Sequence, residues 1–553
     1  MRNIFFYSIA VILLTLASAC NTSKVATQEA KEPQVNNFEW KAANVYFLLT
    51  DRFHNGDTSN DITLNRTKPT GKLRGFEGGD LRGVIHKLES NYFSELGVNA
   101  IWLTPIVEQI HEATNEGSGN TYGYHGYWTR DWTALDPNFG TQEDLKELVD
   151  LAHAQGIRIM LDAVINHTGP VTDVDTVWPS DWVRTEPPCD YQDYNSTVNC
   201  TLVKNLPDIK TESIKDVELP PFLIEKWKKE GRYEQEITSL NAFFEETGYP
   251  RAPKYYIMKW LADYITEFGI DGYRVDTVKH TEPEVWLEFA EICQATFDSY
   301  NKNNPDKFMG TEDFFLVGEV YGYGISQKQN YHFPDCQVNY FENGFPALIN
   351  FDFRSDASKD FEDLFSYYSS TLNDDLKNVT IMNYISSHDD AHPFDKEREN
   401  TYEAGTKLLL TPGISQIYYG DESARSLIIE ETVGDATLRS NMNWDRLENN
   451  LENKSLLMHY QKLGKFRANH PAIGAGTHQM ISKSPYWFSR QYKNDLVIVG
   501  LDLETGNKQV AMKGLFKEGE KLRDAYSGVV TRVKNGKVSL STDYSIVLLE
   551  RVY

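Results

Sequence analysis

Cysteine is scarce in this sequence, with five residues in a chain of 553. No Cys-x-x-Cys pair and no His-Glu-x-x-His motif occurs, so the sequence gives no support for a zinc site. Cys189 and Cys200 share one polar, turn-rich stretch and are the plausible disulfide pair of an exported chain, although the sequence leaves open whether they are bonded. Cys293 lies on an apolar helical face, where we expect a buried free thiol. The remaining cysteines are Cys20 and Cys336.

Positive charge is also in short supply. Lys and Arg number 55 against 80 Asp and Glu, which gives a formal net charge of −25 at pH 7. A protein that binds nucleic acid needs a positive surface to release counterions from the phosphates, so this balance argues against such a partner. An acidic surface is consistent with a neutral substrate, or simply with solubility after export. Hydrophobic residues make up 40% of the chain, which is typical of a globular protein.

Only one apolar run stands out, and it is short. "IFFYSIAVILLTL", Ile4 to Leu16, follows Arg2 at the N-terminus. Such a run is too short to span a bilayer comfortably, but it has the length of a signal-peptide core. We therefore predict a signal peptide over residues 1–19.

The signal peptide is followed by a cysteine. Cleavage after Ala19 makes Cys20 the first residue, which resembles the lipobox of bacterial lipoproteins, although Ala17 stands where a lipobox prefers leucine. Residues 20–39 are polar and lack apolar periodicity, so we predict a lipid-anchored tether. The expected location is the periplasm or the cell surface, with the membrane contacted only through Cys20; a soluble secreted form is the alternative.

From Val45 onward, strand-like apolar runs alternate with helical patterns. "NVYFLL", "VNAIWLTPI" and "IRIMLDAVI" come first, and "DGYRV", "FFLVGEV", "ALINFDF", "IMNYIS" and "GISQIYYG" follow after a long turn-rich interval. Strands that alternate with helices at this spacing form parallel βαβ units. We predict an α/β fold, a (β/α)8 barrel over 40–167 and 253–470 with a subdomain inserted after strand three at 168–252.

The pattern changes again near Pro471. Short strand-like runs such as "YWFSRQY" and "DLVIVGLDL" are separated by turn signals, and helical spacing is absent. These features predict a C-terminal antiparallel β-sandwich domain over 471–553.

Polar residues gather at the predicted carboxyl ends of the barrel strands, where a (β/α)8 barrel builds its active site. Any one of them has a simple explanation as a turn residue or a helix cap. So many ionisable groups at one rim nevertheless indicate an active site. In strand order they are Asp162, Asn166 and His167; Arg274, Asp276, Lys279 and His280; Glu319; and His388 and Asp389.

Carboxylates beside an arginine fit retaining glycoside hydrolysis, in which two carboxyl groups stand about 5 to 5.5 Å apart. Arg274 lies two residues from Asp276 on the same strand face and would keep that carboxylate ionised as a nucleophile. Glu319 follows the apolar "FFLVG", where desolvation can raise its pKa for acid catalysis.

Five stretches, in order along the chain, resemble the motif regions of the α-amylase family, glycoside hydrolase family 13. They are "LDAVINH", "LPDIK", "GYRVDTVKH", "FLVGEV" and "ISSHD". The resemblance extends from about Val45 to the C-terminus, and "LPDIKTES" with "ISSHDD" is most similar to periplasmic and lipoprotein α-amylases of Gram-negative bacteria. It implies Asp276 as nucleophile, Glu319 as acid/base and Asp389 as the carboxylate that stabilises the transition state.

The resemblance also implies the residues that bind the sugar. Ser387 departs from the asparagine that is common in the fourth motif, which bears on subtype rather than on activity. At the cleavage subsite we expect Tyr124 to stack on the sugar and His167, Arg274 and His388 to contact it, with Lys279 and His280 toward the leaving group.

Calcium is the metal that the resemblance implies. Asn166, Asp208 and the backbone carbonyl of His280 would hold Ca²⁺ between barrel and insertion, and hard oxygen ligands suit that ion. A second site resembles the additional calcium loop of cyclodextrin glycosyltransferases, although such stretches are often only turns. Its expected ligands are Asn55, Asp57, Asn60 and Asp61 of "DRFHNGDTSND", with Gly78 and Asp80 of "GFEGGD".

The sequence thus predicts a monomeric, endo-acting α-amylase that hydrolyses α-1,4-glucosidic bonds of starch, glycogen or maltodextrins without an organic cofactor. A maltodextrin-specific hydrolase, a neopullulanase or a glucanotransferase of the same family is the alternative. A noncatalytic glucan-binding lipoprotein is a remote one, because all three catalytic carboxylates are present.

Overall fold

The computed structural model describes residues 38–117 and 119–552. The predicted signal peptide and Cys20 lie outside the described residues. The described residues from Phe38 onward form one compact unit. Within the described ranges, no helix has the length and apolar character needed to cross a membrane.

Eight parallel strands close into a barrel in their order along the chain, as predicted. Every residue of these strands is buried, because their apolar runs face the barrel interior on one side and the surrounding helices on the other. The strands are β1 (Asn44–Leu48), β2 (Ala100–Leu103), β7 (Arg158–Ala163), β10 (Gly272–Val275), β11 (Phe315–Gly318), β14 (Ala347–Asn350), β15 (Thr380–Tyr384) and β16 (Ile414–Tyr418).

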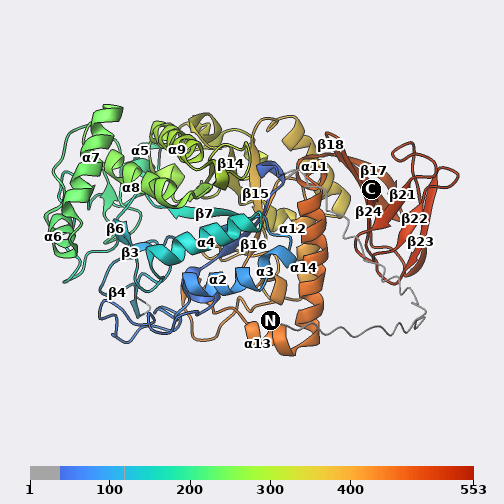
Figure 1. The fold of residues 1–553 in the computed structure, drawn as a ribbon, viewed down its shortest axis with the longest axis horizontal. Coiled ribbons are helices and arrows are strands. Elements are labelled where there is room, and N and C mark those ends of the chain that lie inside the picture. The colour runs from blue at the N-terminus through green and yellow to red at the C-terminus, as the bar shows by residue number, and fades with distance from the viewer. Residues whose placement is uncertain (1–37, 118, 553) are drawn as a thin grey trace, which may run out of the picture. The chain divides into compact units, whose positions relative to one another are not determined.

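Helices cover the outside of the barrel, and Figure 1 shows α2 and α4 lying along that surface. Helix α4 begins with a capping box, in which the side chains of Thr141 and Asp144 satisfy each other's backbone N–H. The longer covering helices are α2 (Leu81–Glu89), α4 (Gln142–Ala154), α8 (Pro253–Phe268), α9 (Pro283–Asn303), α11 (Phe361–Asn373), α12 (Thr401–Leu410) and α14 (Leu451–Asn469).

The predicted insertion follows the third barrel strand. Its tryptophans anchor it to the barrel, because Trp182 stacks on Trp260 of α8 with ring centroids 6.1 Å apart. Figure 1 shows α6 and α7 at the opposite end of the molecule from the C-terminal strands. The inserted elements are β8 (Val183–Arg184), α5 (Asn195–Val198), β9 (Asp208–Ile209), α6 (Pro221–Glu230) and α7 (Tyr233–Thr247).

The C-terminal region is antiparallel, which confirms the predicted β domain. A six-stranded sheet in the order β17-β18-β19-β24-β21-β22 faces the two-stranded sheet β20-β23. Trp487, Ile498 and Leu549 of the larger sheet share a core with Val510 and Leu540 of the smaller one. The strands are β17 (Thr477–Lys483), β18 (Tyr486–Tyr492), β19 (Asp495–Leu501), β20 (Gly506–Ala511), β21 (Lys521–Asp524), β22 (Val530–Arg532), β23 (Lys537–Thr542) and β24 (Val547–Arg551).

The remaining elements are short and lie before, between and after the barrel strands and helices. The strands among them are β3 (Val107–Gln109), β4 (Thr114–Asn115), β5 (Asn120–Thr121), β6 (Thr129–Leu135), β12 (Tyr331–His332) and β13 (Gln337–Val338). The helices are α1 (Thr50–Phe53), α3 (Tyr92–Glu95), α10 (Phe353–Asp356), α13 (Trp444–Asn449) and α15 (Ala472–Ala475). The 3-10 turns are η1 (Trp40–Ala42), η2 (Val278–His280), η3 (Pro305–Lys307), η4 (Ile325–Gln327), η5 (Tyr340–Asn343), η6 (Asp421–Ser423) and η7 (Gly434–Arg439).

The states of Cys189, Cys200 and Cys293 agree with those expected from the sequence. Cys189 and Cys200 form a disulfide within the insertion. Cys293 is a buried free thiol on α9, whereas Cys336 is free and exposed.

Candidate active site

Backbone hydrogen bonds between barrel strands fix the positions of two predicted catalytic carboxylates, Asp276 and Glu319. Asp276 directly follows β10, and its backbone N–H donates to the carbonyl of Ala163 on β7 at 3.0 Å. Glu319 directly follows β11, and its backbone N–H donates to the carbonyl of Val275 at 2.9 Å. Because these bonds extend the parallel ladder, the backbones of both residues are fixed by the scaffold rather than by a free loop.

Arg274 is the centre of the charge network at this rim. Its Nη1 donates to Asp276 Oδ1 at 2.7 Å and to Asp162 Oδ1 at 2.9 Å, and its Nη2 lies 3.5 Å from Glu319 Oε2. Burial by itself would lower the pKa of this guanidinium. The surrounding acidic groups outweigh that effect and raise the pKa of Arg274 well above its ordinary value. One buried cation therefore holds three carboxylates together.

Glu319 lies in a dry environment. Its Oε2 accepts the backbone N–H of Thr277 at 2.9 Å, and its side chain is almost fully buried. Burial outweighs the effect of Arg274 and raises the pKa of Glu319 to about 8. A carboxyl group that stays protonated at neutral pH can donate a proton to a leaving oxygen.

Asp162 accepts a hydrogen bond from Arg274 and is itself held in place by two further hydrogen bonds. Tyr127 Oη and Trp102 Nε1 donate to its Oδ2 at 2.9 and 3.2 Å. Burial raises the pKa of Asp162 to about 7, against the opposing effect of Arg274. Asp162 thus orients the arginine that contacts both predicted catalytic groups.

The third predicted carboxylate lies after β15, next to a histidine. Asp389 Oδ1 lies 3.5 Å from His388 Nδ1, and the hydroxyl of Ser387 lies 3.3 Å from Asp389 Oδ1 and 3.2 Å from His388 Nδ1. Burial raises the pKa of Asp389, whereas burial and the nearby Arg439 lower the pKa of His388. The serine that departs from the family motif therefore contacts both neighbours.

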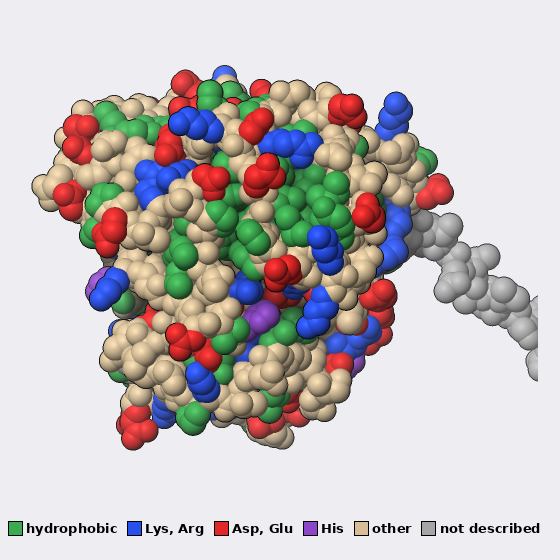
Figure 2. Space-filling view, turned by 90° about the vertical axis from the view of Figure 1, so that its left-hand side faces the viewer, with side chains coloured by type: hydrophobic (Ala, Val, Ile, Leu, Met, Phe, Trp, Pro, Cys, Tyr) green, Lys and Arg blue, Asp and Glu red, His purple; other side chains and the backbone are tan. Residues whose placement is uncertain are grey.

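Asp276 and Asp389 line a pocket of about 210 Å³, whereas Glu319 and Arg274 lie behind Asp276 and are not among its lining residues. Figure 2 shows the corresponding end of the molecule, where acidic, basic and histidine side chains gather around a hollow. Of the predicted residues, Asp276, Asp389, His167 and His388 line this pocket. The other lining residues are Arg74, Glu116, His125, Tyr127, Trp128, Leu206, Asp435 and Arg439.

Tyr124, the expected stacking residue, is not among the residues that line the pocket. Its side chain is fully buried, and the guanidinium of Arg52 covers its ring at 3.9 Å from the centroid. Tyr127 faces the pocket instead, with its ring stacked against His388 at 5.2 Å. The expectation for Tyr124 is therefore corrected, because the turn in "GYHGYW" directs Tyr124 into the core and Tyr127 toward the opening.

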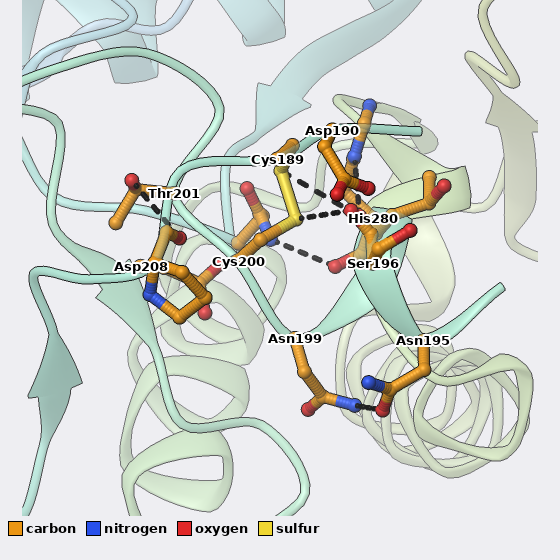
Figure 3. Close-up of a disulfide and its surroundings, with 12 residues drawn as sticks. Cys189, Asp190, Asn195, Ser196, Asn199, Cys200, Thr201, Asp208 and His280 are labelled. Carbon is orange, nitrogen blue, oxygen red and sulfur yellow. Dashed lines mark hydrogen bonds between the residues drawn. A yellow bond between two sulfur atoms is a disulfide. The ribbon is translucent and has the colours of Figure 1, made fainter. Parts of the chain in front are cut away.

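Lys279 and His280 lie beyond Asp276, toward the insertion. Lys279 Nζ donates to the carbonyl of Tyr321 at 3.1 Å. The ring of His280 is buried, with Nδ1 2.8 Å from the carbonyl oxygen of Thr197, and burial lowers the pKa of His280 to about 4. The His280 ring therefore contacts the disulfide loop (Figure 3) rather than the catalytic pocket.

Three residues expected to bind calcium meet between barrel and insertion. Asn166 Nδ2 lies 2.9 Å from Asp208 Oδ1 and 3.0 Å from the carbonyl oxygen of His280. Burial raises the pKa of Asp208 to about 9, although Arg184 lies 2.9 Å from its other oxygen. Turning the Asn166 amide by half a rotation brings a third oxygen to this point, so the donor set fits Ca²⁺.

Asp80, one of the residues expected at the second calcium site, is the N-terminal cap of a helix. Asp80 caps α2 by accepting the backbone N–H of Gly83 at 2.6 Å. It also accepts the backbone N–H groups of Gly56 and Asp57, at 3.0 and 2.8 Å. Asp80 therefore has a structural role in the described fold, whatever else it binds.

Two buried side-chain oxygens in the loop expected to bind the second calcium, Asn55 Oδ1 and Asn60 Oδ1, lack a hydrogen-bond partner among the described residues. Asn55 Nδ2 donates to Asp61 Oδ1 at 2.7 Å, and Gly78 packs so closely that an added Cβ would meet both side chains. This set of buried oxygens also fits Ca²⁺.

Neither candidate rests on a cluster of charged ligands. Within residues 38–117 and 119–552, no group of three or more His, Cys, Asp or Glu side chains is placed to hold a metal ion. The first candidate has one carboxylate, and its other donors are an amide and a backbone carbonyl. Such mixed oxygen sets are usual for Ca²⁺ and unusual for zinc.

The sequence analysis did not select some residues of the pocket. Asp435 pairs with Arg439, and Arg439 Nε donates to the carbonyl of His388 at 2.9 Å. The i,i+4 spacing in "GDATLR" was a weak signal of that pair, but nothing in the sequence connected it to His388. His125 is another lining residue that was not selected from the sequence, although it belongs to the same "GYHGYW" stretch as Tyr127.

Comparisons with known proteins agree with this geometry. The family model "Alpha amylase, catalytic domain" matches residues 47–449. The periplasmic alpha-amylase of Escherichia coli K12 is 33% identical over 90% of this chain and 78% of its own length. A cyclomaltodextrin glucanotransferase of Geobacillus stearothermophilus is 26% identical over 92% of this chain and 66% of its own.

The fold is similar to that of solved α-amylases. A crystal structure of an Anoxybacillus alpha-amylase matches with a TM-score of 0.64 at 25% identity, covering 93% of this chain and 99% of that one. The family match, the E. coli relative and the closed barrel agree with one another. The chain therefore belongs to the α-amylase family and is a glycoside hydrolase.

Proposed function

We propose that this chain is a retaining, endo-acting α-amylase that cleaves α-1,4-glucosidic bonds of starch, glycogen or maltodextrins. The observation that carries the proposal is the contact of one buried arginine with two carboxylates, of which Glu319 has a raised pKa. Arg274 donates to Asp276, while Glu319 lies 3.5 Å from the same guanidinium with a raised pKa. A retaining glycosidase needs such a pair, one group ionised and one protonated.

The proposed reaction has two steps. Asp276 attacks the anomeric carbon, the bond from that carbon to the glycosidic oxygen breaks, and Glu319 gives its proton to the departing oxygen. Glu319 then takes a proton from water, which attacks the same carbon and releases Asp276. Asp389 would stabilise the positive charge that develops on the sugar ring.

Sugar contacts follow from the pocket lining. We assign the stacking platform to Tyr127, whose ring is held by His388 and whose hydroxyl is held by Asp162. An aromatic ring packs well on the apolar face of a sugar. His167 would contact the same sugar, and its Nε2 is oriented by the carbonyl of Tyr127 at 3.1 Å.

Calcium is part of the proposal as a structural ion. Asn166, Asp208 and the His280 carbonyl would hold one ion, and the loop around Asn55 and Asn60 would hold a second. A bound Ca²⁺ supplies positive charge to buried oxygens and takes no part in bond cleavage. Asp208 comes from the insertion and His280 from the barrel, so the first ion would pin the insertion beside the pocket.

We also propose that the protein is exported and attached to a membrane by a lipid. The N-terminal motif supports export and lipid attachment at Cys20, and the E. coli relative is named as periplasmic. The expected partners are an α-glucan substrate and, through the lipid alone, a membrane.

A glucanotransferase of the same family is the second candidate. It is favoured by the match to cyclomaltodextrin glucanotransferases, which covers 92% of this chain. The two activities differ in whether water or a sugar hydroxyl attacks the glycosyl enzyme. That choice depends on water exclusion and on sugar binding at the leaving-group side.

Product analysis separates the candidates. Purified protein is incubated with amylose and calcium, and loss of iodine staining is compared with release of reducing ends. Internal hydrolysis predicts a fast fall in staining at little reducing-end release. Slow loss of staining with one short product from the start supports exo-action, and loss of staining without new reducing ends supports transfer. Asp276→Asn protein is the control for contaminating activity.

A further inference from the structure

A second cavity lies at the junction between the barrel and the C-terminal domain. It is a groove of about 790 Å³, and it shares no lining residue with the catalytic pocket of about 210 Å³. The groove is formed where α11, α12 and α14 meet the C-terminal strands (Figure 1). Pockets that bind small ligands typically measure about 300 to 1,000 Å³, so this junction groove has the size of a binding site.

Four aromatic rings of the junction groove follow one another in contact. The ring centroid of Tyr402 on α12 lies 5.0 Å from that of His459 on α14. The centroid of His459 lies 5.9 Å from that of Tyr526, which lies 5.1 Å from that of Tyr544. The two end members, Tyr402 and Tyr544, are 47% and 45% exposed. The row of rings therefore opens to solvent at both ends.

The inner rings of this row are fixed in place. His459 Nδ1 lies 2.8 Å from Tyr526 Oη, and His459 Nε2 lies 3.1 Å from Thr406 Oγ1. Lys462 Nζ lies 4.5 Å from the ring centroid of Tyr526 and 4.2 Å from that of Tyr544. Burial lowers the pKa of His459 to about 4, so its ring is uncharged at neutral pH. The row is therefore formed before any ligand binds.

Acidic side chains lie beside the rings. Glu403, Asp502 and Asp543 are exposed and line the groove. Lys462 is the one lysine or arginine among the lining residues that the structure describes. Because negative charges outnumber positive ones, an anionic ligand would be repelled. Carboxylates accept hydrogen bonds from hydroxyl groups, so the lining suits a neutral ligand that is rich in hydroxyls.

A sugar chain combines these properties. The apolar face of a glucose unit packs on an aromatic ring, and the hydroxyls at its edge can donate to carboxylates. An α-glucan of this kind is the substrate of the proposed function. Such a polymer is long enough to contact the protein at two places at once.

We propose that the junction groove, with Tyr402 and Tyr544 as its exposed platforms, binds a segment of α-glucan apart from the catalytic pocket. The inference rests on the proposed function and adds a second binding site to it. A polymer bound in the groove remains attached to the protein between cuts. Its next entry into the catalytic pocket is then intramolecular, which raises the effective concentration of substrate.

Binding of maltoheptaose tests the groove directly. Asp276→Asn protein, which cannot turn the sugar over, is expected to bind two maltoheptaose molecules per chain in isothermal titration calorimetry, one in each cavity. Adding Tyr402→Ala and Tyr544→Ala is expected to leave one, because each lost ring contact weakens binding roughly 10-fold. Adding Tyr402→Phe and Tyr544→Phe instead keeps both rings and is expected to leave two.

Hydrolysis tests the consequence for a polymer. Active protein that carries Tyr402→Ala and Tyr544→Ala is expected to release reducing ends from granular starch roughly 5-fold more slowly. Its kcat/KM for maltotetraose is expected to stay unchanged, because each short molecule occupies only one cavity. Phe308→Ala is the matched control, since Phe308 is 49% exposed and lines neither cavity. It is expected to keep the wild-type rates on both substrates.

Two results would overturn the proposed site. One is the same stoichiometry of maltoheptaose binding with and without the two alanine substitutions. The other is an equal loss of activity on granular starch and maltotetraose, which would show that the substitutions act through the catalytic pocket or the fold. Failure of the wild-type protein to release reducing ends from maltotetraose contradicts the proposed function instead, and the binding stoichiometry still decides whether the groove binds glucan.

Discussion

At the scale of single residues, three carboxylates that are buried to a similar extent share one arginine. Asp276 and Glu319 both contact Arg274, and burial raises the pKa of Glu319 to about 8. Asp162 shares the same arginine but is covered by Tyr127 and Trp102. We therefore propose that Asp276 is the nucleophile, Glu319 the acid and Asp162 the support of Arg274.

The pH dependence of activity tests the role of Glu319. A general acid must be protonated, so kcat/KM is expected to fall as pH rises through the pKa of Glu319, with a midpoint near 8. Glu319→Gln cannot donate a proton and is expected to lose about 10³-fold in kcat on maltoheptaose. Steady-state kinetics from about pH 5 to about pH 10 measure both effects.

The control for this experiment is Glu342→Gln, which changes an exposed glutamate on η5. It is expected to keep the wild-type pH profile. A wild-type profile that already declines above about pH 5, near the ordinary pKa of a glutamate, would contradict the assignment of Glu319 as a buried acid.

At the scale of elements, one histidine connects the last barrel helix with the C-terminal sheet. His470 ends α14, and its two ring nitrogens lie 2.8 Å from Asp495 on β19 and 2.8 Å from Glu550 on β24. Burial by itself would lower the pKa of His470. The hydrogen bonds to Asp495 and Glu550 outweigh this effect and raise the pKa of His470 to about 9. The junction between the two elements is therefore charged and titratable.

The stability of this junction is expected to depend on pH. Because the folded-state pKa of His470 is raised above its ordinary 6.5, its contribution is complete below about pH 6.5 and is lost as pH rises through 9. His470→Gln is expected to lower the free energy of unfolding by about 2 kcal/mol at about pH 6 and by much less at about pH 10. Urea denaturation at the two pH values measures the difference. An equal loss at both would show that His470 acts by packing alone.

At the scale of the whole molecule, the insertion and the barrel meet at the first candidate calcium site. Asp208 belongs to β9 of the insertion, Asn166 follows β7, and His280 ends η2 after β10. The disulfide loop is fastened to the same His280 through Thr197. An ion here would therefore connect the catalytic rim to the insertion.

Removal of calcium is expected to loosen that connection. A chelator should lower the thermal unfolding midpoint and expose the insertion to protease, because a ligand at about 100 times its Kd contributes roughly 3 kcal/mol to the folded state. Added Ca²⁺ should reverse both effects. Asp208→Asn is expected to weaken the response, whereas Glu225→Gln, an exposed change on α6 of the same insertion, should not. Equal unfolding midpoints with and without chelator would contradict the proposed ion.

The barrel could be predicted because its signals are local. Each strand is a short apolar run, and each covering helix has apolar residues at helical spacing, so element type follows from a few adjacent residues. Carboxyl ends of parallel strands meet at one rim, so Asp276, Glu319 and Asp389 could be brought together without coordinates. The Cys189–Cys200 pair was likewise short in span, and the structure forms that bond.

Only the tertiary structure decided which face each side chain presents in the loops. Tyr124 and Tyr127 are three residues apart, but Arg52, from a distant part of the chain, covers the first and leaves the second to the pocket. Arg439 reaches His388, and Tyr191 reaches Lys279, across similarly long separations. Periodicity determines which residues form an element, whereas burial and charge at a site depend on every element packed around it, and those neighbours are set by the complete fold.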